Sequence, residues 1–193
     1  MQQVNHIAFK EWASIVGAMA AGKQILILRK GGIREENGEF TVEHNEFFLF
    51  PTFEHQKKED LKPEAHHYLD EALQSKPNLS QIPIRFYAET CGIFHLNHEA
   101  DLNLIDSFHV WSSEAIKERF HFGKNKGLYV LAVKVFQLPK PHQVPYLAEY
   151  GGCKSWVELA TPLSTEGAKA VLSEFQFSNA WKKVQQTFSL ISS

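Results

Sequence analysis

Cations and glycines gather directly after a short apolar run, in residues 29–34 (RKGGIR). Glycines let a backbone approach a ligand closely. Arginine presents a planar fork that suits phosphate or the edge of guanine. The glycine spacing matches neither a Walker nor a Rossmann motif. The segment is therefore either a turn that binds phosphate or base, or a solvated turn whose charges pair with Glu35 and Glu36.

Two acid–histidine pairs form a second candidate for chemistry. Glu43-His44 and Glu54-His55 lie on either side of the apolar run 47–50. Such groups can perform acid–base catalysis or bind a metal, but their spacing matches no zinc motif, and they meet only if the chain folds back. Alternatively, His55 and Gln56 cap the second helix. We therefore treat the four residues as catalytic only if the protein is an enzyme, and expect neither metal nor cofactor.

Aromatic rings occur beside cations at two places. Trp111 and Arg119 flank the short helix predicted near 112–120, and Lys154 lies beside Trp156 in the sequence. Aromatic rings beside cations suit base stacking, although a tryptophan is more often part of the core. The two cysteines, Cys91 and Cys153, have no metal-ligand spacing and are interpreted as buried free thiols.

Composition sets the limits for these candidates. Apolar residues make up 44% of the 193 residues, enough for a sizeable core, and the net charge is −2. This charge argues against a generic polyanion binder but leaves room for a local basic site. No signal peptide or apolar run of about 18 residues is evident, so we expect a cytoplasmic protein without a membrane partner. Without repeats or long linkers, residues 1–193 are expected to form one domain.

Periodicity predicts the elements that position these residues. An amphipathic helix begins near Trp12 and ends at Gly22, and further helices are predicted near 61–73, 112–120 and 181–191. Strands are predicted at 25–28, 47–50, 84–96, 128–138 and 155–159. A bulge is expected at Gly92 and a strand end at Pro139 and Pro141. This order favours an α+β fold over a doubly wound sheet.

Several segments resemble a bacterial family known as domain of unknown function 1802. They are residues 8–12 (AFKEW), 28–33 (LRKGGI), 50–56 (FPTFEHQ) and 152–156 (GCKSW), together with Trp111 and Arg119-Phe120. The order of elements also resembles the PUA-like group, which includes ASCH and EVE domains. That resemblance implies a small, curved or barrel-like, largely antiparallel sheet with surrounding helices. It also implies binding of RNA or modified nucleic-acid bases, or in some members hydrolysis.

The leading hypothesis is a nucleic-acid-binding module, RNA or DNA, that recognises a modified or flipped base. The alternatives are a small hydrolase or nuclease acting on nucleotides or phosphodiesters, and a protein-interaction module. The ligand-binding candidates are Arg29, Lys30, Gly31, Gly32, Arg34, Thr52, Gln56, Trp111, Arg119, Lys154 and Trp156. Ligand identity and oligomeric state stay open.

Overall fold

The structure is a computed structural model, and it describes residues 1–30, 43–76, 80–123, 126–152 and 154–191. The strands are β1 (Val4–Trp12), β2 (Leu26–Arg29), β3 (Glu46–Thr52), β4 (Gln81–Leu96), β5 (Leu128–Pro145), β6 (Trp156–Ser164) and β7 (Lys169–Ala170). The helices are α1 (Ala13–Ala20), α2 (His66–Gln74), α3 (Leu102–Ile105), α4 (Ser113–His121) and α5 (Glu174–Ile191). Within the described residues, no helix combines the length and apolarity that crossing a membrane requires.

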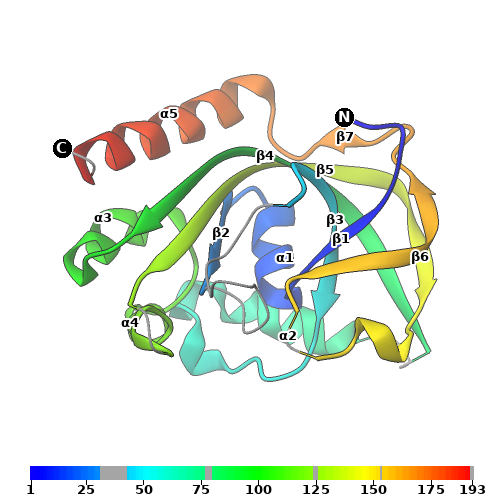
Figure 1. Ribbon diagram of the computed structural model, residues 1–193, viewed down its shortest axis with the longest axis horizontal. Helices are drawn as coiled ribbons and strands as arrows, with labels where there is room; N and C mark the ends of the chain where they lie inside the picture. Colours follow the sequence, from blue (N-terminus) through cyan, green and yellow to red (C-terminus); the bar gives the residue numbers. More distant parts are fainter. Residues whose placement is uncertain (31–42, 77–79, 124–125, 153, 192–193) are drawn as a thin grey trace.

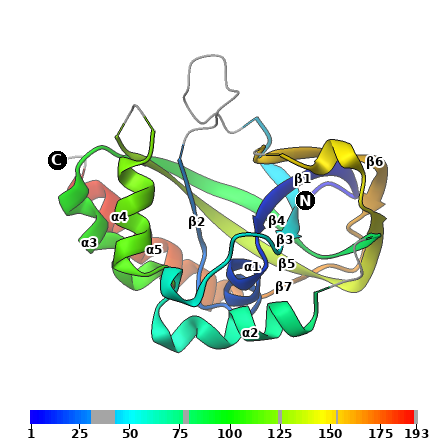
Figure 2. The ribbon, with the colours of Figure 1, turned by 90° about the horizontal axis from the view of Figure 1, so that it is seen from below.

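The strands form one mixed sheet in the order β2-β5-β4-β3-β1-β6, with β7 paired to β5. The β1–β3 pair is parallel and the other pairs are antiparallel. The long strands β4 and β5 arch over α1, while α5 lies along their outer side (Figures 1 and 2). The predicted α+β fold with a curved, largely antiparallel sheet is confirmed.

Two apolar clusters hold the sheet between its helices and loops. One joins α1, α2, α4 and α5 to the sheet, and its members include Ile15, Leu131 and Val184, all with no exposed surface. The other lies around Phe48, Ile84 and Tyr87, near β6. Burial of this apolar area is the main stabilising contribution. Leu131 therefore belongs to the core, whereas Trp12 is only partly buried and packs against it.

The first strand is absent from the sequence prediction, which begins with a helix. β1 buries the polar side chains of Asn5 and Glu11 together with Ala8 and Phe9, so its sequence lacks apolar alternation. Asn5 Nδ2 donates to Tyr87 Oη and to the Glu46 backbone oxygen, both at 2.9 Å. Partners from distant segments thus satisfy this buried amide, which local sequence does not show.

β5 continues beyond the prolines that were predicted to end it. Its register with β4 passes from Gln137↔Phe86 directly to His142↔Ile84. Pro139 and Pro141 therefore lie in a bulge, where a missing backbone N–H breaks no ladder hydrogen bond. The bulge predicted at Gly92 is confirmed by the register shift between Thr90 and Gly92. The predicted helix end is also confirmed, because Gly22 follows α1 with a φ of 67°.

Gly92 lets α5 approach the sheet closely. A Cβ atom there would lie 2.5 Å from the ring of Trp181, which packs near Phe94 of the same strand. We expect Gly92→Val to lower the free energy of unfolding by roughly 1–3 kcal/mol, the range for overpacking. Denaturant titration measures the loss. In a Trp181→Ala background the additional cost of Gly92→Val should largely disappear; a persisting cost would place the strain elsewhere.

Candidate functional site

A cavity of about 550 Å³ lies where the carboxyl ends of β1 and β3 meet the segment that follows β5. Its lining residues are Lys10, Trp12, Phe50, Pro51, Thr52, Phe53, Glu54, His55, Lys76, Ile82, Tyr146, Tyr150, Gly151 and Gly152. The volume falls within the usual range for small-molecule sites, and the walls combine aromatic rings with a few polar groups. These properties make it a candidate ligand site.

Charged side chains occur around this cavity. Lys10 Nζ donates to the backbone oxygens of Tyr150 at 2.9 Å and Gly152 at 2.7 Å, which ties β1 to the segment after β5. Glu54 and Lys76 form an exposed ion pair at 3.1 Å. His55 has a φ of 61°, a backbone conformation uncommon outside glycine. Such strain persists only where the surroundings fix it, and it is frequent at binding sites.

Thr52 and Gln56 hold the cavity wall against α1. Thr52 Oγ1 donates to the backbone oxygen of Glu11 at 3.1 Å. Gln56 Oε1 accepts from Ser14 N at 3.0 Å and from Ser14 Oγ at 2.7 Å, while its Nε2 donates to Thr52 O at 2.7 Å. Gln56 therefore caps the first helix, not the second as predicted, by satisfying an N–H that has no partner within the helix.

Beside the cavity, the Arg119 guanidinium packs against two tryptophans that also contact each other. Its Cζ is 3.9 Å from the ring centroid of Trp111 and 5.0 Å from that of Trp12, and the two indole centroids are 4.6 Å apart. We call these three residues the Trp–Arg–Trp cluster. Trp12 also lines the cavity, so cluster and cavity meet at this ring. The structure thus brings together two sequence-predicted site residues, Trp111 and Arg119.

The positive charge of Arg119 is unusual because few polar groups of the described chain offset it. Within the described chain, its guanidinium has no hydrogen-bond or ion-pair partner. Burial lowers its pKa to about 10, an effect increased by Arg29 and opposed by Glu11 and Asp60. At neutral pH the group remains a cation. Its N–H donors are therefore not used within the described residues.

The side chains of Arg29 and Lys30 lie differently from the prediction. Arg29 Nη2 lies 3.5 Å from Glu11 Oε2 and also donates to the backbone oxygen of Lys10, and its Cζ is 4.6 Å from the Phe9 ring centroid. Lys30 Nζ donates to the backbone oxygens of Phe120 at 2.8 Å and Gly127 at 3.1 Å. Their charged ends fold back onto the chain instead of projecting from the strand end. Gly31, Gly32 and Arg34 lie outside the described residues.

Trp156 and its neighbours occupy another hollow. The Trp156 ring centroid lies 4.8 Å from that of Phe9 and 5.3 Å from that of His44. Trp156 and Lys154 line a shallow hollow of about 380 Å³, and Lys154 Nζ donates to Glu149 O at 2.7 Å. These candidates are therefore separate from the Trp–Arg–Trp cluster, although Phe9 lies between Trp156 and Arg29.

The four acid–base candidates do not gather into one site. His44 packs on Trp156 and lies 3.9 Å from Glu43, whereas Glu54 and His55 line the large cavity. In the part of the chain that the structure describes, no three His, Cys, Asp or Glu side chains converge to hold a metal. Cys91 is exposed, contrary to the buried thiol predicted, and Cys153 lies outside the described residues.

Sequence reasoning missed most of the residues that line the cavity, among them Lys10, Trp12, Tyr146 and Tyr150. Lys10 and Trp12 belong to the stretch 8–12, which resembles the family. That resemblance was the one sequence feature that could have identified them as site residues. Nothing in the local sequence connects them to residues 146–152. Their meeting depends on the long β5 strand, which carries the chain back to the end of β1.

Comparison with curated proteins finds no significant match. Among solved structures, the chain is similar to ASCH from Zymomonas mobilis, with a TM-score of 0.42, 9% identity and 93% of each chain covered. Two single-substitution variants of that protein are also similar. The variant in which phenylalanine replaces a tyrosine gives a TM-score of 0.47 at 9% identity, covering 91% of this chain and 96% of that chain. The variant in which alanine replaces a serine gives a TM-score of 0.46 at 10% identity, covering 95% of this chain and 94% of that chain.

These similarities concern the course of the backbone, and the site residues described above stand on their own contacts. Sequence comparison is more specific. The match to the family described as Domain of unknown function (DUF1802) extends over residues 8–183, nearly the whole of the 193-residue chain, and the chain belongs to that family.

Proposed function

We propose that this chain is a nucleic-acid-binding module that receives one unpaired base, modified or flipped out of its stack, in the 550 Å³ cavity beside Trp12. The observation that carries the proposal is the guanidinium of Arg119, which packs against Trp111 and Trp12 and has no hydrogen-bond or ion-pair partner among the described residues. A phosphate oxygen or a base edge would supply the acceptor that this cation lacks within the described residues.

The energetic argument begins with desolvation. Removing a charged side chain from water is unfavourable unless it is paired or hydrogen-bonded. Two indole faces offset part of that cost through cation–π attraction, but they leave the in-plane N–H donors unused. An anionic ligand at the edge of the guanidinium would complete its hydrogen bonding. This is why the cluster is better explained as half of a binding site than as core packing alone.

The cavity supplies the place for a base. Trp12, Phe53 and Tyr146 give it aromatic walls, and bases of any sequence can stack on such rings. An engineered cavity of about 150 Å³ accommodates one benzene ring, so the larger volume here leaves room for a substituent or part of a sugar. A base must leave a duplex stack to enter, which favours single-stranded or flipped substrates.

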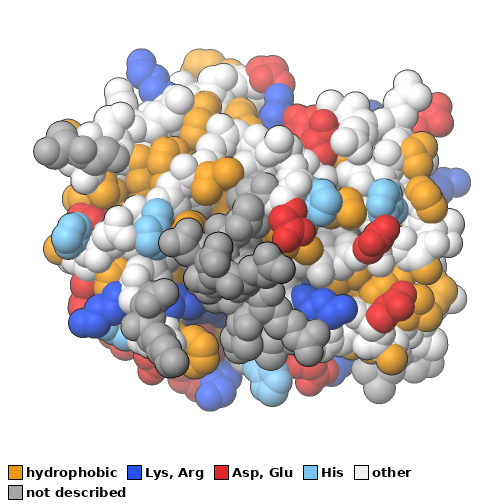
Figure 3. All heavy atoms as spheres, in the orientation of Figure 1, with side chains coloured by type: hydrophobic (Ala, Val, Ile, Leu, Met, Phe, Trp, Pro, Cys, Tyr) orange, Lys and Arg blue, Asp and Glu red, His pale blue; other side chains and the backbone are white. Residues whose placement is uncertain are grey.

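Surface charge supports local recognition over general polyanion binding. Acidic and basic side chains are intermixed on the face shown in Figure 3, where the coloured atoms form no continuous basic patch. The net charge of −2 agrees with this distribution. With one or two phosphate contacts, the slope of log K against log salt on single strands should be shallow, about −0.7 for each phosphate.

The central test is replacement of Arg119. We expect Arg119→Ala to weaken binding of labelled single-stranded RNA or DNA by about tenfold or more, since a hydrogen bond to a charged group is lost. Arg119→Lys, which keeps the charge but not the planar fork, should recover only part of the affinity. Fluorescence anisotropy with single- and double-stranded probes at two salt concentrations measures the effect.

Lys117→Ala is the matched control, because Lys117 is an exposed cation on the same helix, α4. It should bind like the wild type. Equal weakening by Lys117→Ala and Arg119→Ala would indicate nonspecific attraction instead of a site. If the wild-type chain binds no nucleic acid at low salt, the proposed function is wrong.

A further inference from the structure

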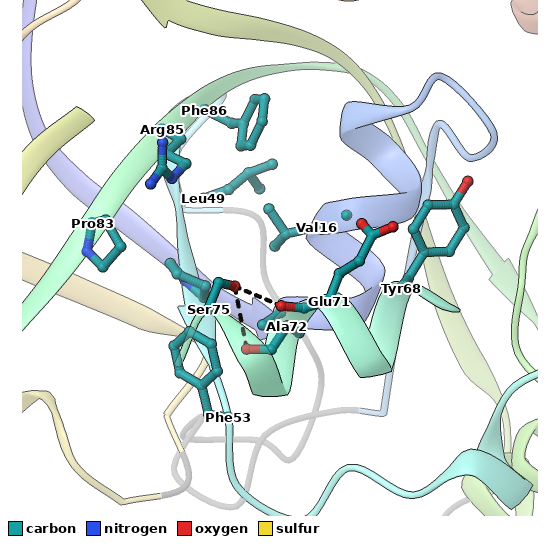
Figure 4. A pocket seen from close by; sticks show the side chains of 13 residues that line it. Val16, Leu49, Phe53, Tyr68, Glu71, Ala72, Ser75, Pro83, Arg85 and Phe86 are labelled. Atoms are coloured by element: carbon teal, nitrogen blue, oxygen red, sulfur yellow. Dashed lines mark hydrogen bonds between the residues drawn. The ribbon is translucent and has the colours of Figure 1, made fainter. Parts of the chain in front are cut away.

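A second, smaller cavity adjoins the first, and Figure 4 shows the side chains that line it. Its volume is about 170 Å³, and it is enclosed by α1, α2, β3 and β4. The lining residues are Ala13, Val16, Gly17, Leu49, Pro51, Phe53, Tyr68, Glu71, Ala72, Ser75, Pro83, Arg85 and Phe86. Its interior is largely apolar, and the polar side chains come from α2, its C-terminal end and β4.

The volume fits one six-membered ring. An engineered cavity of about 150 Å³ with apolar walls binds benzene, whereas drug-sized ligands occupy cavities of roughly 300 Å³ or more. Phe53 and Phe86 provide aromatic surface, and Val16 and Leu49 provide aliphatic surface. A fused purine is less suited to this space than a single ring.

The polar groups have the donor and acceptor chemistry that pairs with the edge of a pyrimidine. Glu71 of α2 and Arg85 of β4 are exposed and have no hydrogen-bond or ion-pair partner for their charged groups among the described residues. Ser75 Oγ is already used, donating to the backbone oxygens of Glu71 at 2.8 Å and Ala72 at 3.3 Å (Figure 4). A carboxylate accepts from an exocyclic amine such as that of cytosine, and a guanidinium donates to a ring carbonyl.

The two cavities are neighbours that share one wall. Pro51 and Phe53 line both of them. Consecutive residues then diverge: Ser75 and Pro83 line the small cavity, whereas Lys76 and Ile82 line the large one. A chain that crosses this ridge could therefore place one group in each cavity and its linking phosphate near the cations Lys76 and Arg85.

We infer that the small cavity binds the pyrimidine ring of the nucleotide adjacent to the one held in the large cavity. This inference rests on the proposed function and makes it more specific. The ligand is then a single strand of at least two nucleotides, with a preference for a pyrimidine at one of two neighbouring positions. Phe53 is the shared partition on which both rings can pack.

A length and sequence series tests this inference. The assay measures competition with a labelled single strand bound to the full chain. The competitors are mononucleotides, dinucleotides that contain a pyrimidine, and dinucleotides that contain only purines, each as RNA and as DNA. We expect pyrimidine-containing dinucleotides to compete about tenfold better than mononucleotides, the scale of one stacked base. Purine-only dinucleotides should gain less, because the fused ring does not enter the smaller space.

Ser75→Trp places a large ring at the mouth of the small cavity. We expect it to reduce the affinity for a pyrimidine-containing dinucleotide to that for a mononucleotide. Gln74→Trp is the matched control, because Gln74 is exposed on the same helix and lines neither cavity. Arg85→Ala is a second variant, which adds no bulk to the cavity, and it should reduce the preference for pyrimidine. Thermal unfolding of each variant checks that it is folded.

The outcomes separate the inference from the proposed function. Binding with no difference between mononucleotides and dinucleotides would overturn the inference and leave the large-cavity site standing. A length effect that survives Ser75→Trp, or that Gln74→Trp removes equally, would also overturn it. Failure of the wild-type chain to bind any probe would overturn the proposed function itself.

Discussion

Replacing Trp111 with alanine is expected to lower the free energy of unfolding by about 3–5 kcal/mol, the range for removing a large aromatic side chain from a core. Trp111 is 1% exposed, and its backbone forms a bridge with Leu61. The substitution removes transfer free energy, leaves a cavity and uncovers one face of the Arg119 guanidinium. Chemical denaturation followed by far-UV circular dichroism measures the loss.

Trp12→Ala is the informative comparison for this prediction. Trp12 is only partly buried and lines the large cavity, so its removal should cost less stability but more ligand affinity. Trp111→Phe should retain more stability than Trp111→Ala, since part of the ring surface is kept. Equal losses of stability for Trp111→Ala and Trp12→Ala would contradict the assignment of one ring to the core and the other to the site.

Elements with a regular apolar period could be predicted from the sequence. The alternation after Leu128 identified β5, and the helical spacing after Trp12 identified α1, because one buried face imposes that period on each. The helix predicted from residue 112 begins there because Ser112 is its N-cap, and Ser112 Oγ accepts from Ala115 N at 3.2 Å. In these segments local pattern and tertiary packing agree.

Segments that bury polar side chains could not be predicted in the same way. β1 places Glu11, 1% exposed, in the interior, where Oε1 accepts from Trp12 N at 2.7 Å and Oε2 lies 3.5 Å from Arg29 Nη2. The burial of the Glu11 carboxylate in a strand can be predicted only when its partner on β2, Arg29, is known. The same pairing explains why Arg29, predicted to meet a ligand, is turned toward the protein.

The candidate site shows the same division. Trp111 and Arg119 were identified from residue type, with Trp111 just before α4 and Arg119 in its last turn. That Trp12 also lies against Arg119 depends on the packing of β1 and α4, which no local pattern records. A cavity is a property of several distant segments, so its lining could not be derived from any one of them.

The stability of the chain is expected to decrease between about pH 6.5 and pH 4 because of His109. Its ring is 5% exposed, and neither ring nitrogen has a hydrogen-bond partner among the described residues. Burial, followed by the nearby Lys62 ammonium, lowers its pKa from 6.5 to about 4, while Asp106 and the Trp111 backbone act in the opposite direction. The folded chain therefore holds this imidazole neutral.

The sign of the effect follows from proton linkage. In the window between the two pKa values the unfolded chain binds a proton at His109 that the folded chain does not, so the free energy of unfolding falls as pH falls. Above pH 6.5 both states are neutral and the effect vanishes; below pH 4 it is complete. The shift corresponds to about 3 kcal/mol, as an order of magnitude.

His109→Phe tests this assignment directly. It removes the titrating group and two unpartnered nitrogens while keeping a planar ring, so we expect its unfolding free energy to vary less than that of the wild type from pH 6.5 to 4. Denaturant titrations at several pH values give the two curves. His98→Phe serves as the control, because that ring is exposed, and its curve should run parallel to that of the wild type. A His109→Phe curve as steep as the wild-type curve would assign the acid sensitivity to carboxylates elsewhere in the fold, since those that are ion-paired in the folded chain also lose stabilisation as they protonate.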